Sequence, residues 1–397
     1  MKIIYLKAGN TTELSGGGAE ASKMLHAIEQ WVENNPESSL SVVSGDRMDI
    51  QGREAPIKRH WKDVASRILL HSSYLYIDWC FKGLKDSIIG ANPDMIFLGN
   101  SRLGFAIDEI RRMIPDCFLI VHFDNVEFDY VESAFSMKRG ILGRLLKNIE
   151  KITVKRDEAI GSLDSNIRLF LTERDKDRIE MLYGIGEGMS VVLPICLPDN
   201  QVKLHKLSEV SPHLVFLGSL WYESNVMALL WFLDNIWMAV KASFPNATLT
   251  VGGRNPSKHL IDYLTKERGV ILFPDFENIA DVVCRNSIFI SPIQKGAGMK
   301  VKIAEALSLG LPILASEESL VGYSEALLDS MNRGVIIKAE TKEDYIDGLK
   351  SVIESDLKEV SDNARRLFVK YYSYERAITS MNDILGKINQ KKGNNHG

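Results

Sequence analysis

The feature that most constrains the fold of this 397-residue chain is the alternation of short apolar runs with longer helical patterns. Apolar runs that return after each helix, rich in Val, Ile, Leu and Phe, are typical of the buried strands of a parallel sheet. We expect strands at residues 2–8, 39–45, 94–99, 117–123, 166–172, 213–219, 247–253, 269–275, 287–293, 312–316 and 335–339.

This alternation weakens at about 194–212, a stretch rich in proline and polar residues, and then restarts. The sequence therefore predicts an α/β fold of two Rossmann-like doubly wound domains, an N-terminal one over 1–200 and a C-terminal one over 201–374. A last helix and tail over 375–397 are expected to pack back toward the N-terminal domain. Two such halves would face a cleft, and ligands of these sheets bind beyond the carboxyl ends of the strands.

The composition argues against several other classes of protein. Hydrophobic residues make up 45% and charged residues 25% of the chain, as in ordinary globular proteins. The formal net charge of −4 gives no general attraction to nucleic acid, so no nucleic-acid partner is expected. The first apolar run is too short for a signal peptide, and no run has the ~18 residues of a membrane-spanning helix. The four cysteines are widely spaced and are expected to be buried thiols, which predicts a cytoplasmic protein.

The stretch SPIQKGAGMKVKIAEALSLGLPILAS, residues 291–316, places Gly-Ala-Gly between a predicted strand and a helix expected to begin near Met299. Glycines there let the backbone approach an anion and present N–H groups to it. Lys300 and Lys302 would lie in the first helical turn, where the helix dipole disfavours cations unless an anion binds. Glu305, on the same face as Lys302, could accept hydrogen bonds from ribose hydroxyls. Solvated lysines and a Lys–Glu pair in an ordinary β–α turn fit the same spacing.

The order of residues in this stretch resembles the donor-site motif of GT-B glycosyltransferases. It is more closely similar to their retaining branch, glycosyltransferase family 4. The matching positions are Pro292, Gly296, Gly298, Lys302, Glu305, Ala306, Gly310, Pro312, Ser316, Gly322 and Tyr323, with Gly218, Ser219, Asn225 and Trp231 upstream. Many family members carry a further glutamate where this chain has Ala297, so the resemblance is to a variant with a glycine pair.

The resemblance implies a retaining glycosyltransferase that uses a nucleoside-diphosphate sugar as donor and needs no metal or other cofactor. The implied acceptor is a hydroxyl of a glycan or lipid-linked glycan, in bacterial surface polysaccharide synthesis. Backbone amides, the helix dipole and a catalytic Lys302 would stabilise the leaving diphosphate. The predicted donor-binding residues are Gly17, Gly18, Ser219, Arg254, Phe276, Gly296, Gly298, Met299, Lys300, Lys302 and Glu305.

The N-terminal half supplies further candidates. Gly17 and Gly18 belong to a glycine run that is predicted to form a loop after the first strand. The stretch IVHFDNVEFDY places His122 at the carboxyl end of a strand, where it is predicted to orient the donor sugar or the acceptor. Asn125 and Glu127 follow as predicted acceptor-binding residues. A solvated loop histidine is the alternative interpretation of His122.

Residues 137–156 carry seven lysines and arginines against one glutamate, beside an apolar stripe. Such a segment can rest on the anionic inner face of a membrane, and an ordinary packed helix with a solvated basic face fits equally well.

Three other functions stay open on the sequence. A sugar-nucleotide 2-epimerase would share the two-domain fold. A metal-dependent, single-domain GT-A transferase would use the carboxylates of Asp124, Glu127 and Asp129. A non-catalytic protein would bind a nucleotide sugar or a glycan without turnover.

Overall fold

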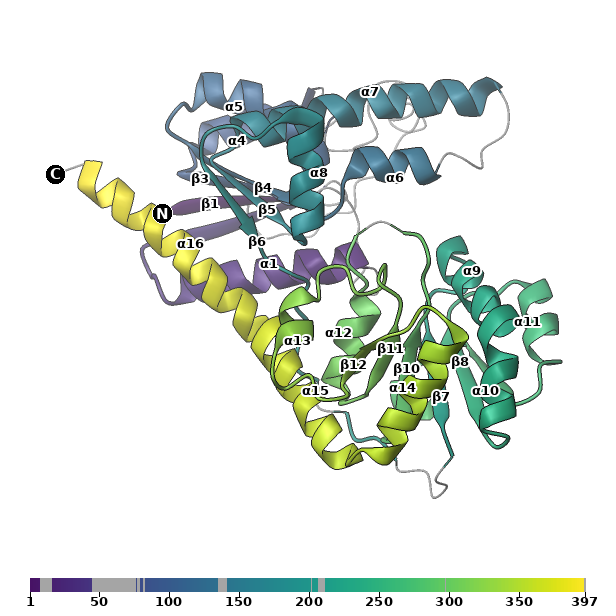
Figure 1. Ribbon diagram of the computed structural model, residues 1–397. Helices are drawn as coiled ribbons and strands as arrows, with labels where there is room; N and C mark the ends of the chain where they lie inside the picture. The colour runs from purple at the N-terminus through teal and green to yellow at the C-terminus, as the bar shows by residue number, and fades with distance from the viewer. Residues whose placement is uncertain are drawn as a thin grey trace. The chain divides into compact units, whose positions relative to one another are not determined.

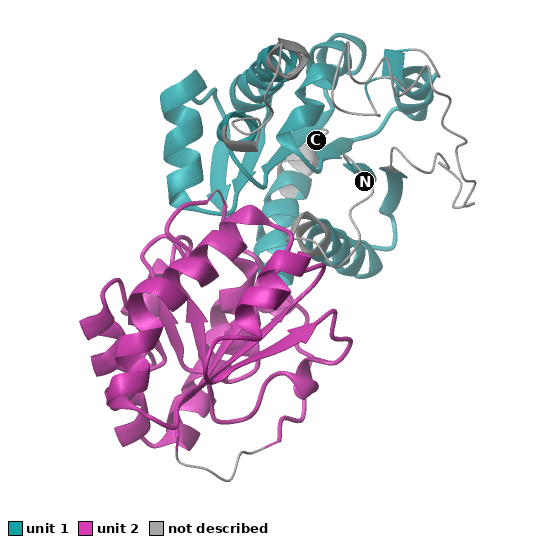
Figure 2. Ribbon diagram, turned by 90° about the vertical axis from the view of Figure 1, so that its right-hand side faces the viewer, with its two compact units in different colours: residues 1–194, 377–397 teal, residues 195–376 magenta. Residues whose placement is uncertain are grey.

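The computed structural model describes residues 1–7, 16–44, 76, 79–80, 83–134, 141–200, 202–205, 211–296 and 298–395. The chain divides into two compact units (Figure 2). Unit 1 comprises Met1–Pro194 and Ala377–Gly397, and unit 2 comprises Ile195–Arg376. The domain limits expected from the sequence, after 200 and after 374, stay a prediction.

Unit 1 is built on a six-stranded parallel sheet in the order β2-β1-β3-β4-β5-β6 (Figure 1). The strand order reverses beside β1, so the switch point of this sheet lies between β1 and β3. The strands are β1 (Lys2–Lys7), β2 (Ser39–Ser44), β3 (Met95–Leu98), β4 (Phe118–Phe123), β5 (Ile167–Phe170) and β6 (Met189–Val192).

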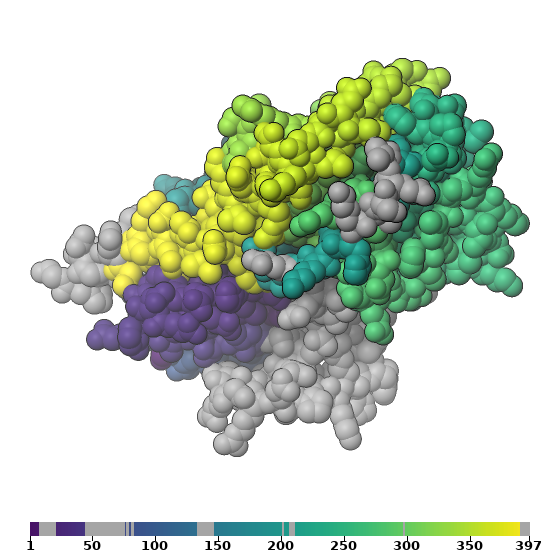
Figure 3. Space-filling model, turned by 90° about the horizontal axis from the view of Figure 1, so that it is seen from below, coloured from purple at the N-terminus to yellow at the C-terminus, as the bar shows by residue number. Residues whose placement is uncertain are grey.

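Helices cover both faces of this sheet, with α4, α5 and α7 on one face and α1 on the other (Figure 1). Figure 3 shows the C-terminal part of α16 next to α1 on the surface of unit 1. Apolar side chains of β1, β3 and β4, among them Ile4, Ile96 and Val121, form a buried core with α4 and α5 on one face of the sheet. The helices are α1 (Gly16–Glu33), α4 (Leu84–Ala91), 3₁₀ helix η1 (Ser101–Ala106), α5 (Ile107–Met113), α6 (Glu127–Ala134), α7 (Ile141–Asp164), α8 (Glu173–Tyr183) and α16 (Tyr374–Asn395).

Unit 2 has a second six-stranded parallel sheet, in the order β12-β11-β10-β7-β8-β9. The chain runs outward from β7 through β8 to β9 and then returns to β10 on the other side of β7. The switch point is therefore between β7 and β10. The strands are β7 (His213–Leu217), β8 (Thr248–Gly253), β9 (Val270–Pro274), β10 (Ser287–Ser291), β11 (Ile313–Ala315) and β12 (Ile336–Lys338).

Some helices of unit 2 begin at recognisable capping residues. Thr341 and Asp344 form a capping box at the start of α14, and the Asp356 side chain accepts from two amides at the start of α15. The helices are α9 (Glu223–Phe232), π-helical turn η2 (Leu233–Trp237), α10 (Met238–Ser243), α11 (Lys258–Leu264), 3₁₀ helix η3 (Ile279–Asp281), α12 (Val301–Ser308), α13 (Ser324–Leu328), α14 (Lys342–Glu354) and α15 (Leu357–Tyr372).

The predicted α/β fold with two doubly wound sheets is confirmed. Every expected strand is present, but β6 was not predicted, because Met189–Val192 is short and only half-buried and so has a weak apolar pattern. The expectation of buried cysteines fails for Cys80, whose side chain is exposed, whereas Cys117 and Cys196 are buried.

One helical stretch, Glu223–Ser243, is long and apolar enough to cross a membrane by composition, with a mean hydropathy of 1.3. It comprises α9, η2 and α10, and its inner face, including Leu229, Phe232 and Ile236, belongs to the core of unit 2. A core helix passes the same test of length and hydropathy, so the stretch carries no conclusion about a membrane.

Candidate functional site

The candidate site lies in unit 2, where the chain leaves β7 and β10. These two strands are neighbours, and their carboxyl ends flank the switch point of the sheet. The segment after β10 reaches the segment after β7 through Ser224, whose hydroxyl donates to the Lys295 carbonyl at 2.6 Å. The sequence did not single out Ser224. The start of α9 and the glycine turn after β10 therefore meet at the edge where ligands of such sheets bind.

The glycine turn has a backbone that an ordinary residue would strain. Gly298 has a φ of 66°, in the left-handed region that favours glycine. A Cβ added at Gly296 would lie 3.3 Å from Lys300 Nζ and 3.5 Å from Ser224 Oγ, so the turn is also closely packed there. Met299 is buried, and its Sδ accepts from the Ile195 amide at 3.4 Å. Ala297 lies outside the described residues.

The helix after this turn begins at Val301, two residues later than expected. Lys300 is its N-cap and has an extended backbone, with φ −87° and ψ 97°. The reason is the left-handed Gly298, from which the chain needs two more residues to reach helical geometry. The amides of Val301 and Lys302 now occupy the first turn, where backbone N–H groups precede any intrahelical acceptor.

The two lysines of the turn have different surroundings. Lys300 Nζ donates to the Gly298 carbonyl at 2.8 Å and pairs with Glu318 at 3.2 Å, and its side chain is only 12% exposed. Lys302 Nζ pairs with Glu305 Oε2 at 2.6 Å, and its side chain is 42% exposed. Lys300 thus stabilises the turn through buried contacts, whereas Lys302 is accessible to a ligand. The Lys302–Glu305 pair is the one anticipated for an ordinary β–α turn.

A segment after β11 holds the glycine turn in place. Ser319 is buried, and its hydroxyl donates to the Ser291 carbonyl at 2.7 Å and accepts from the Ile293 amide at 3.3 Å. The Ser316 hydroxyl contacts the Ile293 carbonyl at 2.5 Å. Tyr323 reaches the start of α12 from the same segment. Ser316 and Tyr323 belong to the family motif, but Ser319 and Glu318 were missed, because only the fold brings them against the turn.

The strand ends on the other side of β7 are tightly packed. A Cβ added at Gly253 would lie 1.9 Å from the Gly218 carbonyl oxygen, so glycine is required there. Ser219 is half-buried, and its carbonyl accepts from Asn225 Nδ2 at 3.1 Å. The Arg254 side chain is exposed after β8. Phe276, after β9, packs close to Gly252, where an added Cβ would lie 3.0 Å from its Cε1 atom.

The predicted residues of unit 1 lie at the carboxyl end of β4. His122 is buried within the strand, at 1% exposure, rather than in a solvated loop. Asn125 is half-buried in the following turn. Glu127 is buried at the start of α6, and its Oε2 accepts from Arg102 Nε at 2.6 Å. Arg102 also pairs with Glu150 on α7.

A buried carboxylate from α7 caps the start of α6. Glu158 accepts from the Glu127 amide at 2.8 Å, from the Phe128 amide at 3.1 Å and from the Tyr183 hydroxyl at 3.0 Å. Burial raises the pKa of Glu158 to about 7, and the nearby Glu127 carboxylate acts in the same direction. Glu158 therefore fixes the turn that carries Asn125 and Glu127, although nothing in its sequence context marked it.

The carboxylates proposed for a metal ion are bound by other side chains. Asp124 Oδ1 accepts from Asn100 at 2.7 Å, and Asp129 forms a bidentate pair with Arg178, with both contacts at 2.8 Å. Within the described part of the chain, no group of three His, Cys, Asp or Glu side chains is placed to hold a metal.

The glycine run and the basic segment also differ from expectation. Gly17 and Gly18 lie in the first turn of α1, which begins at Gly16, and not in a loop. The basic segment falls largely on α7, where Lys147 and Lys151 both pair with Glu132 of α6. Lys155 and Arg156 are exposed further along α7, as is Ile152 from the predicted apolar stripe, at 69%. Residues 137–140 lie outside the described residues.

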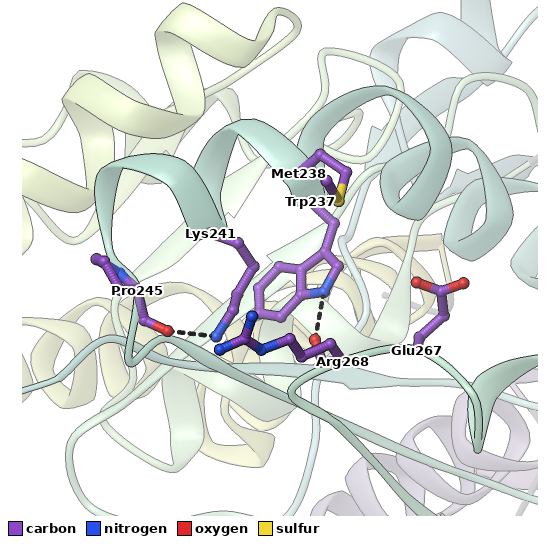
Figure 4. Close-up of a pocket in the computed structure, with 6 residues that line it drawn as sticks. All are labelled: Trp237, Met238, Lys241, Pro245, Glu267 and Arg268. Atoms are coloured by element: carbon purple, nitrogen blue, oxygen red, sulfur yellow. Dashed lines mark hydrogen bonds between the residues drawn. The ribbon is translucent and has the colours of Figure 1, made fainter.

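A pocket of about 150 Å³ is present elsewhere in unit 2 (Figure 4). The Trp237 indole donates to the Arg268 carbonyl at 3.2 Å, and Lys241 donates to the Pro245 carbonyl. Pro245 and Arg268 lie in the loops that precede β8 and β9. The pocket is therefore at the amino ends of the strands, away from the candidate site. Its lining is Trp237, Met238, Lys241, Pro245, Glu267 and Arg268.

Two doubly wound sheets, with a glycine turn and a cation-bearing helix start at the switch point of the second, are the arrangement expected of the GT-B fold. Residues 211–355, most of unit 2, match the family described as "Glycosyl transferases group 1".

Other proteins are similar to this chain in sequence or in structure. An uncharacterized 44.6 kDa protein in the cps region of Klebsiella pneumoniae is 22% identical over 276 residues, 66% of each chain. WaaG, a glycosyltransferase involved in lipopolysaccharide biosynthesis, has a similar structure, with a TM-score of 0.61 and 15% identity over 97% of this chain and all of WaaG. Anabaena HepE, solved with UDP and glucose, has a TM-score of 0.58 and 12% identity over 98% of this chain and all of HepE. At these identities the structures establish the shared fold. The predictions of a GT-B fold and of a glycosyltransferase are confirmed.

Proposed function

We propose that this chain is a retaining glycosyltransferase that moves a sugar from a nucleoside-diphosphate sugar to a hydroxyl of a glycan or lipid-linked glycan. The observation that carries the proposal is the meeting of the glycine turn, the start of α12 and the start of α9 at the switch point of unit 2. That site lies within the segment that matches the glycosyl transferases group 1 family. HepE, which shares the fold, was solved with UDP and glucose.

The chemistry requires stabilisation of a diphosphate that gains negative charge as it leaves. The amides of Gly298 and Met299, and those of the first turn of α12, supply neutral donors, and the helix dipole favours an anion there. Lys302 supplies the mobile cation, because its ammonium group is more exposed than that of Lys300. Moving Lys302 from Glu305 to a phosphate would free the Glu305 carboxylate for the ribose hydroxyls. We expect no metal to be needed.

The remaining predicted residues complete the site in this proposal. Ser219, Arg254 and Phe276 contact the donor from the ends of β7, β8 and β9, and Gly17 and Gly18 contact it from the first turn of α1. His122 orients the donor sugar or the acceptor, and Asn125 and Glu127 bind the acceptor. The sugar is transferred with retention through attack from the face of the leaving phosphate.

The acceptor belongs to surface polysaccharide synthesis in this proposal. The support is the cps-region relative and the lipopolysaccharide role printed for WaaG. The enzyme would act in the cytoplasm or on the inner face of the cell membrane, where lipid-linked acceptors are exposed.

The proposal is tested by a thermal-shift screen with UDP-, GDP-, dTDP- and ADP-sugars. A ligand that binds only the folded chain raises Tm by mass action, so the correct donor identifies the nucleotide. Lys302→Ala should abolish most of that shift. Lys350→Ala is the matched control, because Lys350 forms the same kind of i,i+3 pair, with Asp347 on α14, far along the chain from the site.

Turnover with the selected donor then separates the functions. Incubation of a labelled donor with a glycan acceptor panel should give a labelled glycan with the donor's anomeric configuration. An epimerised sugar nucleotide formed without acceptor would identify a 2-epimerase, and donor binding without turnover would identify a binding protein. Donor binding by Lys302→Ala equal to that of the wild type would refute the phosphate site.

A further inference from the structure

A buried tyrosine interrupts the hydrogen bonding of the first turn of α12. The Ala304 amide donates to the Tyr323 hydroxyl at 3.1 Å, and that hydroxyl donates to the Lys300 carbonyl at 2.8 Å. Lys300 is the N-cap, and Ala304 is the residue whose amide normally bonds directly to that carbonyl. The phenol oxygen is thus inserted into the first hydrogen bond of the helix.

Other helices of unit 2 show the ordinary arrangement. In α14 the Tyr345 amide donates directly to the carbonyl of its N-cap, Thr341, at 3.1 Å. In α15 the Val360 amide donates to the carbonyl of Asp356 at 3.0 Å. In α12 the Lys300 carbonyl instead accepts from the Ile303 amide at 3.0 Å, an i→i+3 hydrogen bond, and the Tyr323 hydroxyl bridges that carbonyl to the Ala304 amide.

The surroundings of Tyr323 fix this position. Its side chain is fully buried, and its ring packs on Tyr372 of α15 with centroids 4.9 Å apart. Glu318, five residues earlier on the same segment, holds the Lys300 ammonium at 3.2 Å. Burial raises the pKa of the Tyr323 phenol, so the hydroxyl keeps the proton that it donates. The segment after β11 therefore holds Lys300 by both its backbone and its side chain.

We propose that Tyr323 is a positioning residue for the donor diphosphate, acting through the first turn of α12. This inference rests on the proposed function. With the hydroxyl in place, the amides of Val301 and Lys302 and the Lys302 side chain keep a fixed offset from Gly298. Without it, the Ala304 amide would bond directly to the Lys300 carbonyl, and the first turn would change from its i→i+3 hydrogen bond to an ordinary α-helical turn, which displaces these groups from the diphosphate.

The test compares Tyr323→Phe with Tyr372→Phe. Both substitutions remove one hydroxyl from the same pair of packed rings, but only that of Tyr323 bonds to α12. The probe is whichever of UDP, GDP, dTDP and ADP stabilises the wild-type chain most. We expect Tyr323→Phe to bind this diphosphate about fivefold more weakly or worse, because the loss is comparable to the free energy of roughly one hydrogen bond. Tyr372→Phe should bind the diphosphate as the wild type does.

Steady-state kinetics supply a readout that general destabilisation would not give. Tyr323→Phe should raise KM for the donor and leave KM for the acceptor unchanged. Diphosphate binding within twofold of wild type, or an equal loss in Tyr372→Phe, would overturn the inference and leave the proposed function standing. If the wild-type chain binds none of the four diphosphates, the inference about Tyr323 and the proposed function are both refuted.

A crystal structure covers the case in which Tyr323→Phe does not fold. In the wild-type complex with the selected diphosphate, the Tyr323 hydroxyl must lie between Ala304 N and Lys300 O while first-turn amides contact a phosphate. A direct Ala304–Lys300 hydrogen bond in that complex would contradict the inference.

Discussion

Burial has different effects on two pairs of charged side chains: one pair stays partly exposed and weakly bound, and the other includes a carboxylate whose ionisation burial disfavours. In unit 2, Lys302 and Glu305 are partly exposed, so their pairing is weak and can be exchanged for a ligand. In unit 1, Glu158 accepts hydrogen bonds from Ser101, Tyr183 and two amides of α6, and the Glu127 carboxylate raises its pKa further. Water cannot solvate the Glu158 carboxylate there, so its ionisation is coupled to the folding of unit 1.

Glu158 makes the stability of the chain depend on pH. Its folded pKa, about 7, is above the value near 4.5 of an exposed glutamate, so the folded state holds the proton more tightly. The stabilising effect is complete below pH 4.5 and is lost as the pH rises toward 7, by on the order of 3 kcal/mol. Glu158→Gln cannot ionise and should flatten this part of the stability curve.

Urea unfolding between pH 4.5 and 8 measures this effect. The matched control is Glu180→Gln, an exposed position on α8 that should leave the curve unchanged. Equal slopes in wild type and Glu158→Gln would show that the Glu158 carboxylate does not titrate in this range.

At the scale of elements, the site is a contact between segments that follow β7, β10 and β11. Each strand ends at the same edge of the sheet, but hydrogen bonds between the segments fix their positions. Ser224 joins the start of α9 to the glycine turn, and Ser319 joins the segment after β11 to the end of β10. The turn therefore depends on side chains that are distant in sequence.

Ser319→Ala should destabilise the chain and loosen the turn. The substitution leaves the buried Ser291 carbonyl and Ile293 amide without the Ser319 hydroxyl, at a cost of about 1–3 kcal/mol. Donor affinity should also fall, because the end of β10 leads into Gly296. Ser351→Ala, at an exposed position of α14, is the control.

Urea unfolding and donor titration test both effects. A Ser319→Ala variant with wild-type stability and affinity would mean that the serine contacts do not hold the turn.

At the scale of the whole molecule, the proposed localisation depends on the outer surface of α7. Lys147 and Lys151 share the single carboxylate of Glu132, and Lys155 and Arg156 are exposed basic residues within the described part of the segment. A few exposed basic residues give weak, salt-dependent attraction to anionic lipid.

Co-sedimentation with phosphatidylglycerol–phosphatidylcholine vesicles tests this contact. The double variant Lys155→Glu, Arg156→Glu should bind at least tenfold more weakly at low salt, since each basic residue contributes about 1 kcal/mol. Lys342→Glu, Lys350→Glu on α14 changes the net charge equally and should bind as wild type. Equal losses in both variants, or no vesicle binding by wild type, would remove α7 as a membrane contact.

The sequence by itself determined which segments are strands and that they form two parallel sheets. The physical reason is that a strand buried on both faces needs a continuous apolar run, and such a run is a local pattern in the sequence. The edge strand β6 was not predicted, because a half-buried strand has a weaker pattern of apolar residues. The sequence also located the glycine turn, since a left-handed residue such as Gly298 favours glycine.

Only the tertiary structure decided how the turn is held. Val301, not Met299, begins α12, because the left-handed Gly298 delays helical geometry. Lys300 and Lys302 look alike in sequence, but Glu318 encloses one of them and leaves the other accessible. The insertion of Tyr323 depends on packing of the segment after β11 against α15, where Tyr323 contacts Tyr372. Contacts between segments far apart in the chain leave no local pattern, so burial and hydrogen bonding fix them only once the sheet has formed.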